Sequence, residues 1–263
     1  SAAADNESTR IPPVAFENKT LEAGLTRYSP TFSIVVTDID RDGVDDLFVG
    51  HHGFPPSLYL NRDMRFVEES NVLPPPLKVR KDRHGYTFVD FDNDGDKDFV
   101  VAGGGADGIG AGMPNENYKN LLVETNKLEF VDVTKDSDIT DPTSRTRHLF
   151  PIANPQGDKV DLYSTGLHKP RKNSKNIYAV NNSTSSRIIF NSDGRSSLHQ
   201  EFESDGKDLF FDFDRDGLVD FLKVGQGQAL LYRNVAGRFS QFPPWPGNIW
   251  GVISAVSADL NND

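Results

Sequence analysis

Residues 89–101 read VDFDNDGDKDFVV, and five aspartates fall within the nine residues from Asp90 to Asp98. Apolar residues, many of them β-branched or aromatic, flank this acidic run and are typical of two buried strands joined by a turn. In a D-x-D-x-D-G-x-x-D turn, the side chains at positions one, three, five and nine surround one point, and the backbone carbonyl of position seven joins them. The stretch therefore predicts an oxygen cage for a hard cation. Calcium fits better than magnesium, because calcium accepts roughly six to eight oxygens in variable geometry.

The acidic turn is repeated along the chain. Full copies read TDIDRDGVDDLFVG at residues 37–50 and FDFDRDGLVDFLKVG at residues 211–225. A broken copy, IANPQGDKVDLYSTG, occupies residues 152–166, and the sequence ends on the beginning of another copy, SADLNND. The spacing of these copies indicates a repeat of about 50 to 60 residues, which is the size of one β-propeller blade.

Each repeat is predicted to contain four strands. In the second repeat these are YTFVD, DFVVAG, NLLVE and EFVDVT, which begin at Tyr86, Asp98, Asn120 and Glu129. Four antiparallel strands per repeat, arranged radially, predict an all-β fold of the β-propeller class. We expect four-stranded blades with a calcium-binding D-x-D-x-D-G turn between strands 1 and 2 of most blades.

The propeller is expected to occupy residues 14–263, after a flexible N-terminal segment of residues 1–13. The predicted blades are residues 29–70, 84–135, 145–192 and 205–243, with an incomplete fifth blade from residue 248. Residues 14–25 look like the end of a blade and are predicted to close the last one. Because a fifth turn begins at the end of the sequence, we expect a further C-terminal segment or another polypeptide to complete a ring of about seven blades.

The predicted calcium ligands are the carboxylates and carbonyls of three complete turns and one truncated turn. They are Asp38, Asp40, Asp42, Val44 and Asp46; Asp90, Asp92, Asp94, Asp96 and Asp98; Asp212, Asp214, Asp216, Leu218 and Asp220; and Asp259, Asn261 and Asp263. One such turn alone is often an aspartate–glycine turn that binds nothing, but three matches at blade spacing favour calcium. An EF-hand is excluded, because it needs a glutamate at position twelve and flanking helices. The broken copy has Ile152, Asn154 and Gln156 at carboxylate positions, so no metal is expected there.

Histidine and basic residues gather in the segments before strand 1 and after strand 2 of the blades. Because the acidic turns join these strands at one face of the ring, the histidine segments are expected to share the opposite face. The predicted ligand-binding residues are His51, His52, Arg83, His84, Arg147, His148 and His168, with His51, His84 and His148 as candidate catalytic residues. Arginine and lysine pair with carboxylate or sulfate, so the face predicts binding of an anionic polysaccharide or an extracellular protein. A polysaccharide lyase is the alternative, in which a cation neutralises a uronate carboxylate and a histidine or tyrosine removes the neighbouring proton.

The composition excludes several other classes of protein. A formal net charge of −11 argues against nucleic-acid binding, and the chain contains no cysteine for disulfides or thiolate metal sites. The chain contains no run of eighteen apolar residues, so no membrane span is predicted. The small, polar N-terminal residues SAAADNESTR look like a mature end after removal of a signal peptide, so we expect a secreted, periplasmic or cell-surface protein.

The D-x-D-x-D-G-x-x-D turns resemble those of the FG-GAP or VCBS calcium-loop propellers. The segments FENKTLEAGL, from Phe16, and NLLVETNKLEFVDVTKDSDI, from Asn120, are similar to blade endings in the group related to cartilage acidic protein and the ASPIC/UnbV proteins. The resemblance implies a secreted protein that serves adhesion, ligand binding or, when elaborated, polysaccharide breakdown.

Overall fold

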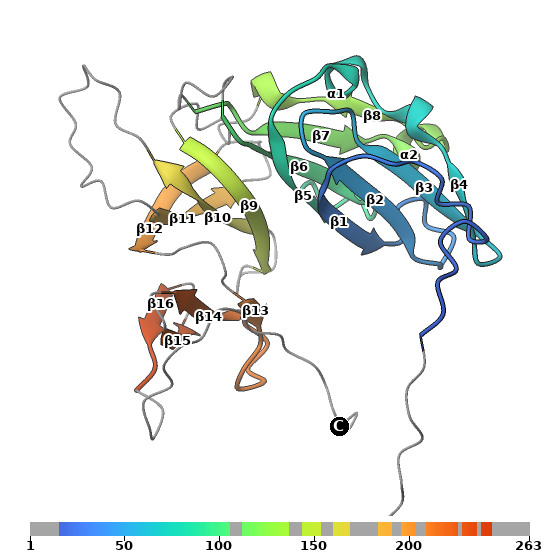
Figure 1. The fold of residues 1–263 in the computed structure, drawn as a ribbon. Helices are drawn as coiled ribbons and strands as arrows, with labels where there is room; N and C mark the ends of the chain where they lie inside the picture. The colour runs from blue at the N-terminus through green and yellow to red at the C-terminus, as the bar shows by residue number, and fades with distance from the viewer. Residues whose placement is uncertain are drawn as a thin grey trace, which may run out of the picture.

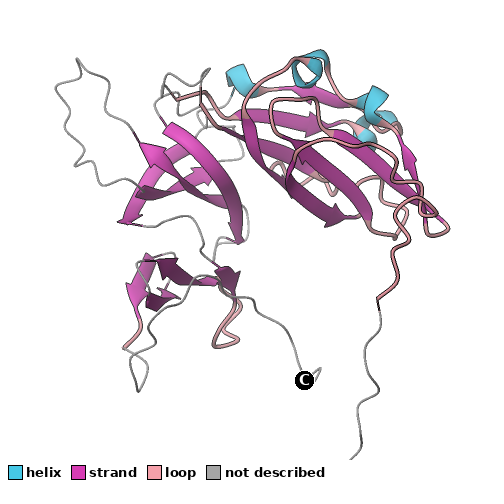
Figure 2. Ribbon diagram, viewed as in Figure 1, coloured by secondary structure: helices cyan, strands magenta, loops and turns pink. Residues whose placement is uncertain are grey.

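The computed structural model describes residues 16–105, 112–136, 144–153, 160–168, 184–190, 196–203, 209–225, 228–235 and 238–243. These residues form four antiparallel sheets of four strands, each in sequence order (Figures 1 and 2). The first sheet contains β1 (Thr31–Thr37), β2 (Asp46–His51), β3 (Ser57–Arg62) and β4 (Arg65–Glu68). The second contains β5 (Arg83–Val89), β6 (Asp98–Gly103), β7 (Glu116–Asn120) and β8 (Phe130–Asp132). This all-β arrangement of four-stranded sheets is consistent with propeller blades.

The third sheet contains β9 (Ser144–Ala153), β10 (Val160–His168), β11 (Thr184–Phe190) and β12 (Ser196–Glu203). The fourth contains β13 (Leu209–Phe211), β14 (Asp220–Gly225), β15 (Gln228–Val235) and β16 (Arg238–Gln241). The third sheet runs past residue 192, where the sequence analysis ended the third blade. The helical elements are single turns: η1 (Ser70–Val72), α1 (Pro75–Lys78), α2 (Leu122–Thr125) and η2 (Thr134–Asp136). Among the described residues, no helix is long and apolar enough to cross a membrane.

The first strands of neighbouring sheets pack against one another, and β5 contacts both β1 and β9. Phe48 of β2 joins the first two sheets, because its ring centroid lies 4.9 Å from that of Tyr86 and 5.4 Å from that of Phe99. Phe150 of β9 lies 4.6 Å from Phe210 of β13 and links the third sheet to the fourth. These aromatic contacts bury large apolar surfaces between sheets and fix their spacing.

A Tyr-x-Asn sequence marks the third strand of three sheets. Phe99 and Tyr118 are cross-strand partners with stacked rings 4.9 Å apart, and Phe221 and Tyr232 repeat the pair at 4.6 Å. In the first sheet Leu47 takes the phenylalanine's place opposite Tyr59. The second and fourth sheets therefore share the same Phe–Tyr cross-strand pair, and the first sheet keeps its tyrosine.

The predicted strand at Asn120–Glu124 is wrong. The third strand of the second sheet ends at Asn120, and α2 follows as one helical turn. A residue of the acidic turn stabilises α2, because the Val123 N–H donates to Asp96 Oδ2 at 2.9 Å. The true strand, ENYKN, escaped the apolar pattern because its polar residues Glu116, Asn117 and Asn120 are buried.

The described part of the segment predicted to close the last blade, residues 16–25, contains a turn at residues 20–24 and no strand. It lies beside β4, where the Phe66 N–H donates to the Ala23 carbonyl at 2.8 Å. The incomplete fifth blade, which was expected from residue 248, lies outside the described residues.

A buried ion pair ties α1 to the second sheet. Arg83 is 1% exposed and donates from Nε to Glu116 Oε2 at 2.6 Å and from Nη2 to Glu116 Oε1 at 3.2 Å. Its other bonds reach the carbonyls of Val79, at 2.9 Å, and Pro76, at 2.7 Å. Burial alone would lower the pKa of Arg83, but its hydrogen bonds to Glu116 raise it above the usual value.

Replacing Glu116 should therefore be costly. Glu116→Ala leaves the Arg83 charge buried without its partner, and we expect the free energy of unfolding to fall by about 3–5 kcal/mol. Urea unfolding of the calcium-supplied protein measures this loss. Glu129→Ala, at an exposed position before β8, is the matched control and should change stability by less than about 0.5 kcal/mol. Equal effects of the two substitutions would show that the ion pair does not stabilise the sheet.

Candidate functional site

The three complete acidic turns adopt the same backbone conformation. Positions four and six are both left-handed in each turn. The φ angles are 60° and 87° at Arg41 and Gly43, 61° and 98° at Asn93 and Gly95, and 59° and 84° at Arg215 and Gly217. Glycine at position six avoids the strain that a side chain would suffer there.

Side chains at positions one and five brace the turn from inside. In the second turn, the Gly95 N–H donates to Asp90 Oδ2 and the Asp96 N–H donates to Asp94 Oδ1, both at 3.0 Å. The first and fourth sheets repeat both bonds. They join Gly43 to Asp38, Val44 to Asp42, Gly217 to Asp212 and Leu218 to Asp216. Each position-five aspartate thus commits one oxygen to the turn, whereas Asp90 and Asp212 commit both, because their Oδ1 atoms accept the N–H groups of Asp94 and Asp216 at 3.2 Å.

The aspartate at position nine is a buried clamp between the turn and the third strand. Asp98 accepts from the Phe91 N–H at 3.0 Å and from the Asn120 N–H at 2.9 Å, one on each oxygen. Asp46 and Asp220 make the same two bonds in their own sheets, and all three aspartates are fully buried. Burial raises the pKa of all three, that of Asp98 to about 8, despite the backbone donors. Neighbouring aspartates of each turn raise these pKa values further.

The asparagine of Tyr-x-Asn completes this clamp, and the sequence analysis missed its role. The side-chain amides of Asn61, Asn120 and Asn234 each donate to the carbonyl of the residue before the ninth-position aspartate, at 3.1, 3.3 and 3.1 Å. The repeated spacing of Tyr and Asn was the signal available in the sequence.

Carboxylate oxygens within each turn are close enough to share a cation. Ligand atoms lie within 4.8 Å of one another in these groups: Asp38, Asp40 and Asp42; Asp90, Asp92 and Asp94; Asp94, Asp96 and Glu124; and Asp212, Asp214 and Asp220. Asp38 Oδ1, Asp40 Oδ1 and Asp92 Oδ1 are buried without a hydrogen-bond partner among the described residues. Buried, unpartnered carboxylate oxygens in an all-oxygen donor set fit a hard divalent cation. Glu124 was not predicted, because it lies on α2 where a strand was expected.

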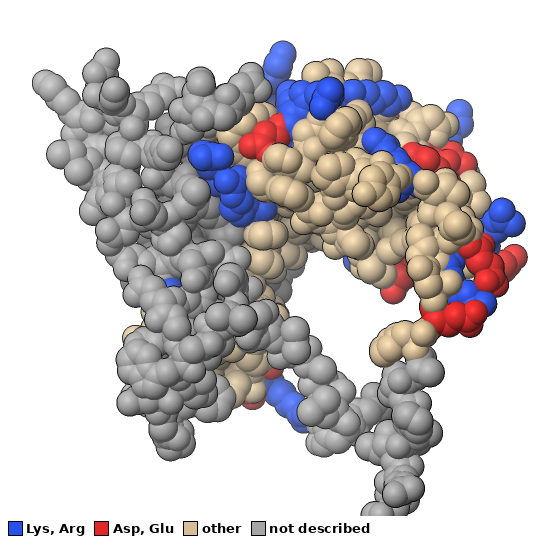
Figure 3. All heavy atoms as spheres, viewed as in Figure 1, with Lys and Arg blue, Asp and Glu red and all other residues tan. Residues whose placement is uncertain are grey.

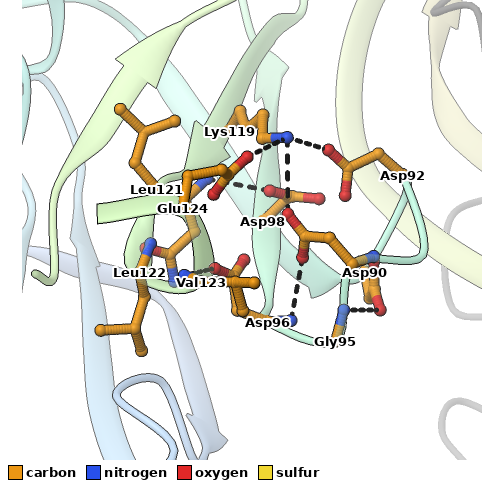
Figure 4. Close-up of polar contacts among 12 residues, drawn as sticks. Asp90, Asp92, Gly95, Asp96, Asp98, Lys119, Leu121, Leu122, Val123 and Glu124 are labelled. Carbon is orange, nitrogen blue, oxygen red and sulfur yellow. Dashed lines mark hydrogen bonds and ion pairs between the residues drawn. The ribbon is translucent and has the colours of Figure 1, made fainter. Parts of the chain in front are cut away.

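A basic side chain from the third strand reaches into each turn. Lys119 contacts Asp92 and Glu124, as Figure 4 shows, and its Nζ lies 2.5 Å from Glu124 Oε1. The same Nζ lies 3.4 Å from Asp94 Oδ2. In the other turns, Arg62 Nη2 lies 2.5 Å from Asp40 Oδ2 and Arg233 Nε lies 2.5 Å from Asp214 Oδ2. These cations offset part of the acidic charge and would repel a bound metal ion.

Lys119→Met should therefore change stability in opposite directions with and without calcium. In chelator the variant loses three ion pairs and should be about 1 kcal/mol less stable than the wild type. With calcium, removal of the competing ammonium should raise affinity at the second turn about tenfold. Calorimetric titration and melting curves, each with calcium and with chelator, measure both effects. A variant that is destabilised equally in both conditions would contradict competition between Lys119 and calcium.

At the opposite end of the sheets, the first strands of three sheets contain bulges. The registers of β1, β5 and β9 slip between Thr31 and Ser33, between Arg83 and Tyr86, and between Thr146 and His148. Bulges redirect side chains and are frequent beside functional sites. Here they occur at Phe32, at His84–Gly85 and at Arg147.

His52, Asp82 and His84 converge at this end. The Nε2 atoms of both histidines lie 2.8 Å from Asp82 Oδ1. Phe32 stacks on the His52 ring at a centroid distance of 4.2 Å and lies 5.2 Å from the His84 ring. Asp82 Oδ2 accepts the Gly105 N–H at 2.8 Å. Asp82 was not predicted, because only tertiary contacts bring it between two histidines.

Two arginines of β9 border this group. A Cβ at Gly85 would lie 2.6 Å from the Arg147 carbonyl oxygen, and a Cβ at Gly105 would lie 2.6 Å from Arg145 Nε. Arg145 Nε and Arg147 Nη1 are buried nitrogens without a hydrogen-bond partner among the described residues. Burial and the neighbouring Arg145 charge lower the pKa of Arg147. We call His52, Asp82, His84, Arg145 and Arg147 the His–Arg cluster.

Figure 3 shows Lys and Arg side chains gathered at the end of the first two sheets that carries α1. Not every residue predicted for this face joins the His–Arg cluster. His51 is 2% exposed and contacts Ser57 Oγ at 3.2 Å, and Arg83 is committed to Glu116. His148 is exposed on β9 and stacks with Phe150. His168 ends β10, but its side chain is outside the described residues, as are Asp259, Asn261, Asp263 and the broken turn at 154–159.

His84 makes the stability of the cluster depend on pH. Burial and Arg147 lower its pKa to about 4, from 6.5, and these effects outweigh Asp82. A lowered histidine pKa means that stability is fully present above the unfolded pKa of 6.5 and is lost as the pH falls toward 4. Between about pH 7.5 and about pH 5.5, we expect the wild type to lose roughly 1 kcal/mol more than His84→Gln.

Urea unfolding at both pH values tests this expectation, in buffer that contains calcium but no transition metal. Parallel pH dependence in the two proteins would mean that His84 is not the group responsible.

The FG-GAP-like repeat family matches residues 38–101 and 212–263. Both matched segments begin at the first aspartate of an acidic turn, and they support the FG-GAP part of the resemblance. The match does not extend to the narrower group of cartilage acidic protein and the ASPIC/UnbV proteins. No curated protein matches the chain.

Proposed function

We propose that this chain is a secreted, calcium-stabilised propeller module that binds an anionic ligand, a glycan or a protein, through the His–Arg cluster. The observation that carries the proposal is the pair of partly buried guanidinium groups, Arg145 and Arg147, with unpartnered nitrogens beside a single carboxylate, Asp82. Two cations held close together at the cost of burial favour a negatively charged ligand. FG-GAP-like repeats suggest an extracellular repeat module, which agrees with the proposed location.

Calcium has a structural role in this proposal. The acidic turns lie between strands 1 and 2, whereas the His–Arg cluster lies at the other end of the same strands. A cation that neutralises a turn would stiffen the strand pair that carries the ligand-binding side chains. The residues proposed to hold calcium are the grouped aspartates, with the carbonyls of Val44, Asp96 and Leu218 as further donors.

The test is a binding titration with polygalacturonate and dextran sulfate, which supply carboxylate and sulfate groups. Arg145→Gln and Arg147→Gln should each weaken binding about tenfold or more, because each removes a charge-assisted hydrogen bond. Both should flatten the dependence of affinity on salt. Arg65→Gln, at an exposed position of β4, is the matched control and should leave affinity unchanged. Equal losses in all three variants, or no binding by the wild type, would reject the site.

The second candidate function is a polysaccharide lyase, and the neutral His84 imidazole favours it. The side chain of His84 is 14% exposed and contacts Asp82, in a cluster whose arginines suit the uronate carboxylate. His51 is too deeply buried for this role. Incubation with polygalacturonate should then yield unsaturated uronates, and His84→Gln should reduce the rate about a hundredfold or more. Binding without such products assigns the cluster to recognition alone.

A further inference from the structure

Three different donor atoms meet in the His–Arg cluster. One ring nitrogen of His52, one ring nitrogen of His84 and one carboxylate oxygen of Asp82 lie within 4.8 Å of one another. They come from the residue after β2, the residue before β5 and β5 itself. Two imidazoles and one carboxylate form a donor set that borderline metals such as zinc accept, whereas calcium takes only oxygens.

The contacts among these atoms are close, but they are not directed as hydrogen bonds. Asp82 Oδ1 is buried and has no hydrogen-bond partner among the described residues, although both Nε2 atoms lie 2.8 Å away. A buried carboxylate oxygen without a directed donor needs another partner. A metal ion between the three atoms supplies one, because the donor lone pairs then point at a common centre and not at each other.

Packing holds all three side chains in place without a metal. The His52 ring lies on Phe32 at an interplanar angle of 15°, and the backbone N–H of His52 donates to the Pro30 carbonyl at 2.9 Å. Gly104 packs so closely against His84 that a Cβ at Gly104 would lie 2.3 Å from His84 Cδ2. The Gly105 N–H holds the second oxygen of Asp82. Such supporting contacts orient metal ligands and raise affinity.

We propose that His52, Asp82 and His84 form a binding site for a divalent transition metal, zinc in the first place. With three protein ligands, the metal keeps one coordination position open, as in open zinc sites. The His52 side chain is 44% exposed, so the open position is reached from solvent. Metal–ligand distances of about 2.0–2.1 Å require each Nε2 atom to move away from Asp82 Oδ1 by roughly half an ångström.

The neighbouring arginines define what the open position would take. Arg145 and Arg147 add positive charge that one carboxylate does not balance, so an anionic fourth ligand is favoured over water. A carboxylate or phosphate oxygen meets this requirement. This last step rests on the proposed anion-binding function, whereas the three-residue metal site does not.

The experiment is a calorimetric titration of the calcium-saturated protein with zinc ions alone. Calcium saturation protects the acidic turns from adventitious zinc. We expect one zinc ion per chain, bound at least about tenfold more weakly by His52→Gln and by His84→Gln. His148→Gln, an exposed histidine of β9, is the matched control and should bind zinc like the wild type. Cobalt, used as a coloured substitute, should give visible absorption that the same two substitutions remove.

No zinc uptake, or equal affinity in all three histidine variants, would overturn the proposal. If His84→Gln does not fold, as circular dichroism would reveal, the half-exposed His52→Gln alone decides. The zinc result is distinct from the anion result, because Arg147→Gln should retain zinc whether or not the protein binds polysaccharide. A wild-type protein that takes up one zinc ion but binds no polysaccharide would reject the proposed function and leave the metal site standing.

Discussion

The buried aspartate at position nine is the interaction on which the described sheets depend. It binds two backbone N–H groups that lie far apart in the sequence, one in the turn and one in the third strand. Asp98, for example, joins Phe91 to Asn120. A buried carboxylate needs these donors, and the strands need a fixed register, so one residue satisfies both requirements. The same arrangement recurs at Asp46 and Asp220.

This clamp explains why acidic residues concentrate at one end of each sheet. In the second turn, position five uses one oxygen on turn N–H groups, and positions one and nine each use both oxygens on backbone N–H groups. Carboxylate oxygens of each turn lie within 4.8 Å of one another, and a lysine or arginine from the third strand offsets some of their charge. The turn is therefore a folding element first, and its closely spaced carboxylates form the candidate metal group.

The opposite end of the strands has a different chemistry. Register slips in three first strands let Phe32, His84 and Arg147 depart from strict alternation. Closely packed glycines then allow neighbouring sheets to approach, so that residues from separate repeats meet. A site assembled in this way can change its side chains without disturbing the acidic clamps, because the two ends share strands but not contacts.

The sequence by itself determined the repeat, the acidic turns and the four-stranded sheets, because these depend on local spacing. Positions one to nine of a turn are neighbours in the chain, so their grouping follows from the motif. It did not determine the strand at Glu116–Asn120, whose buried polar residues lack an apolar pattern. Only the tertiary structure decided that Arg83 and His51 are buried and that Asp82 meets two histidines. Which side of a bulged strand faces a neighbouring sheet is fixed by packing between repeats, and no local pattern encodes it.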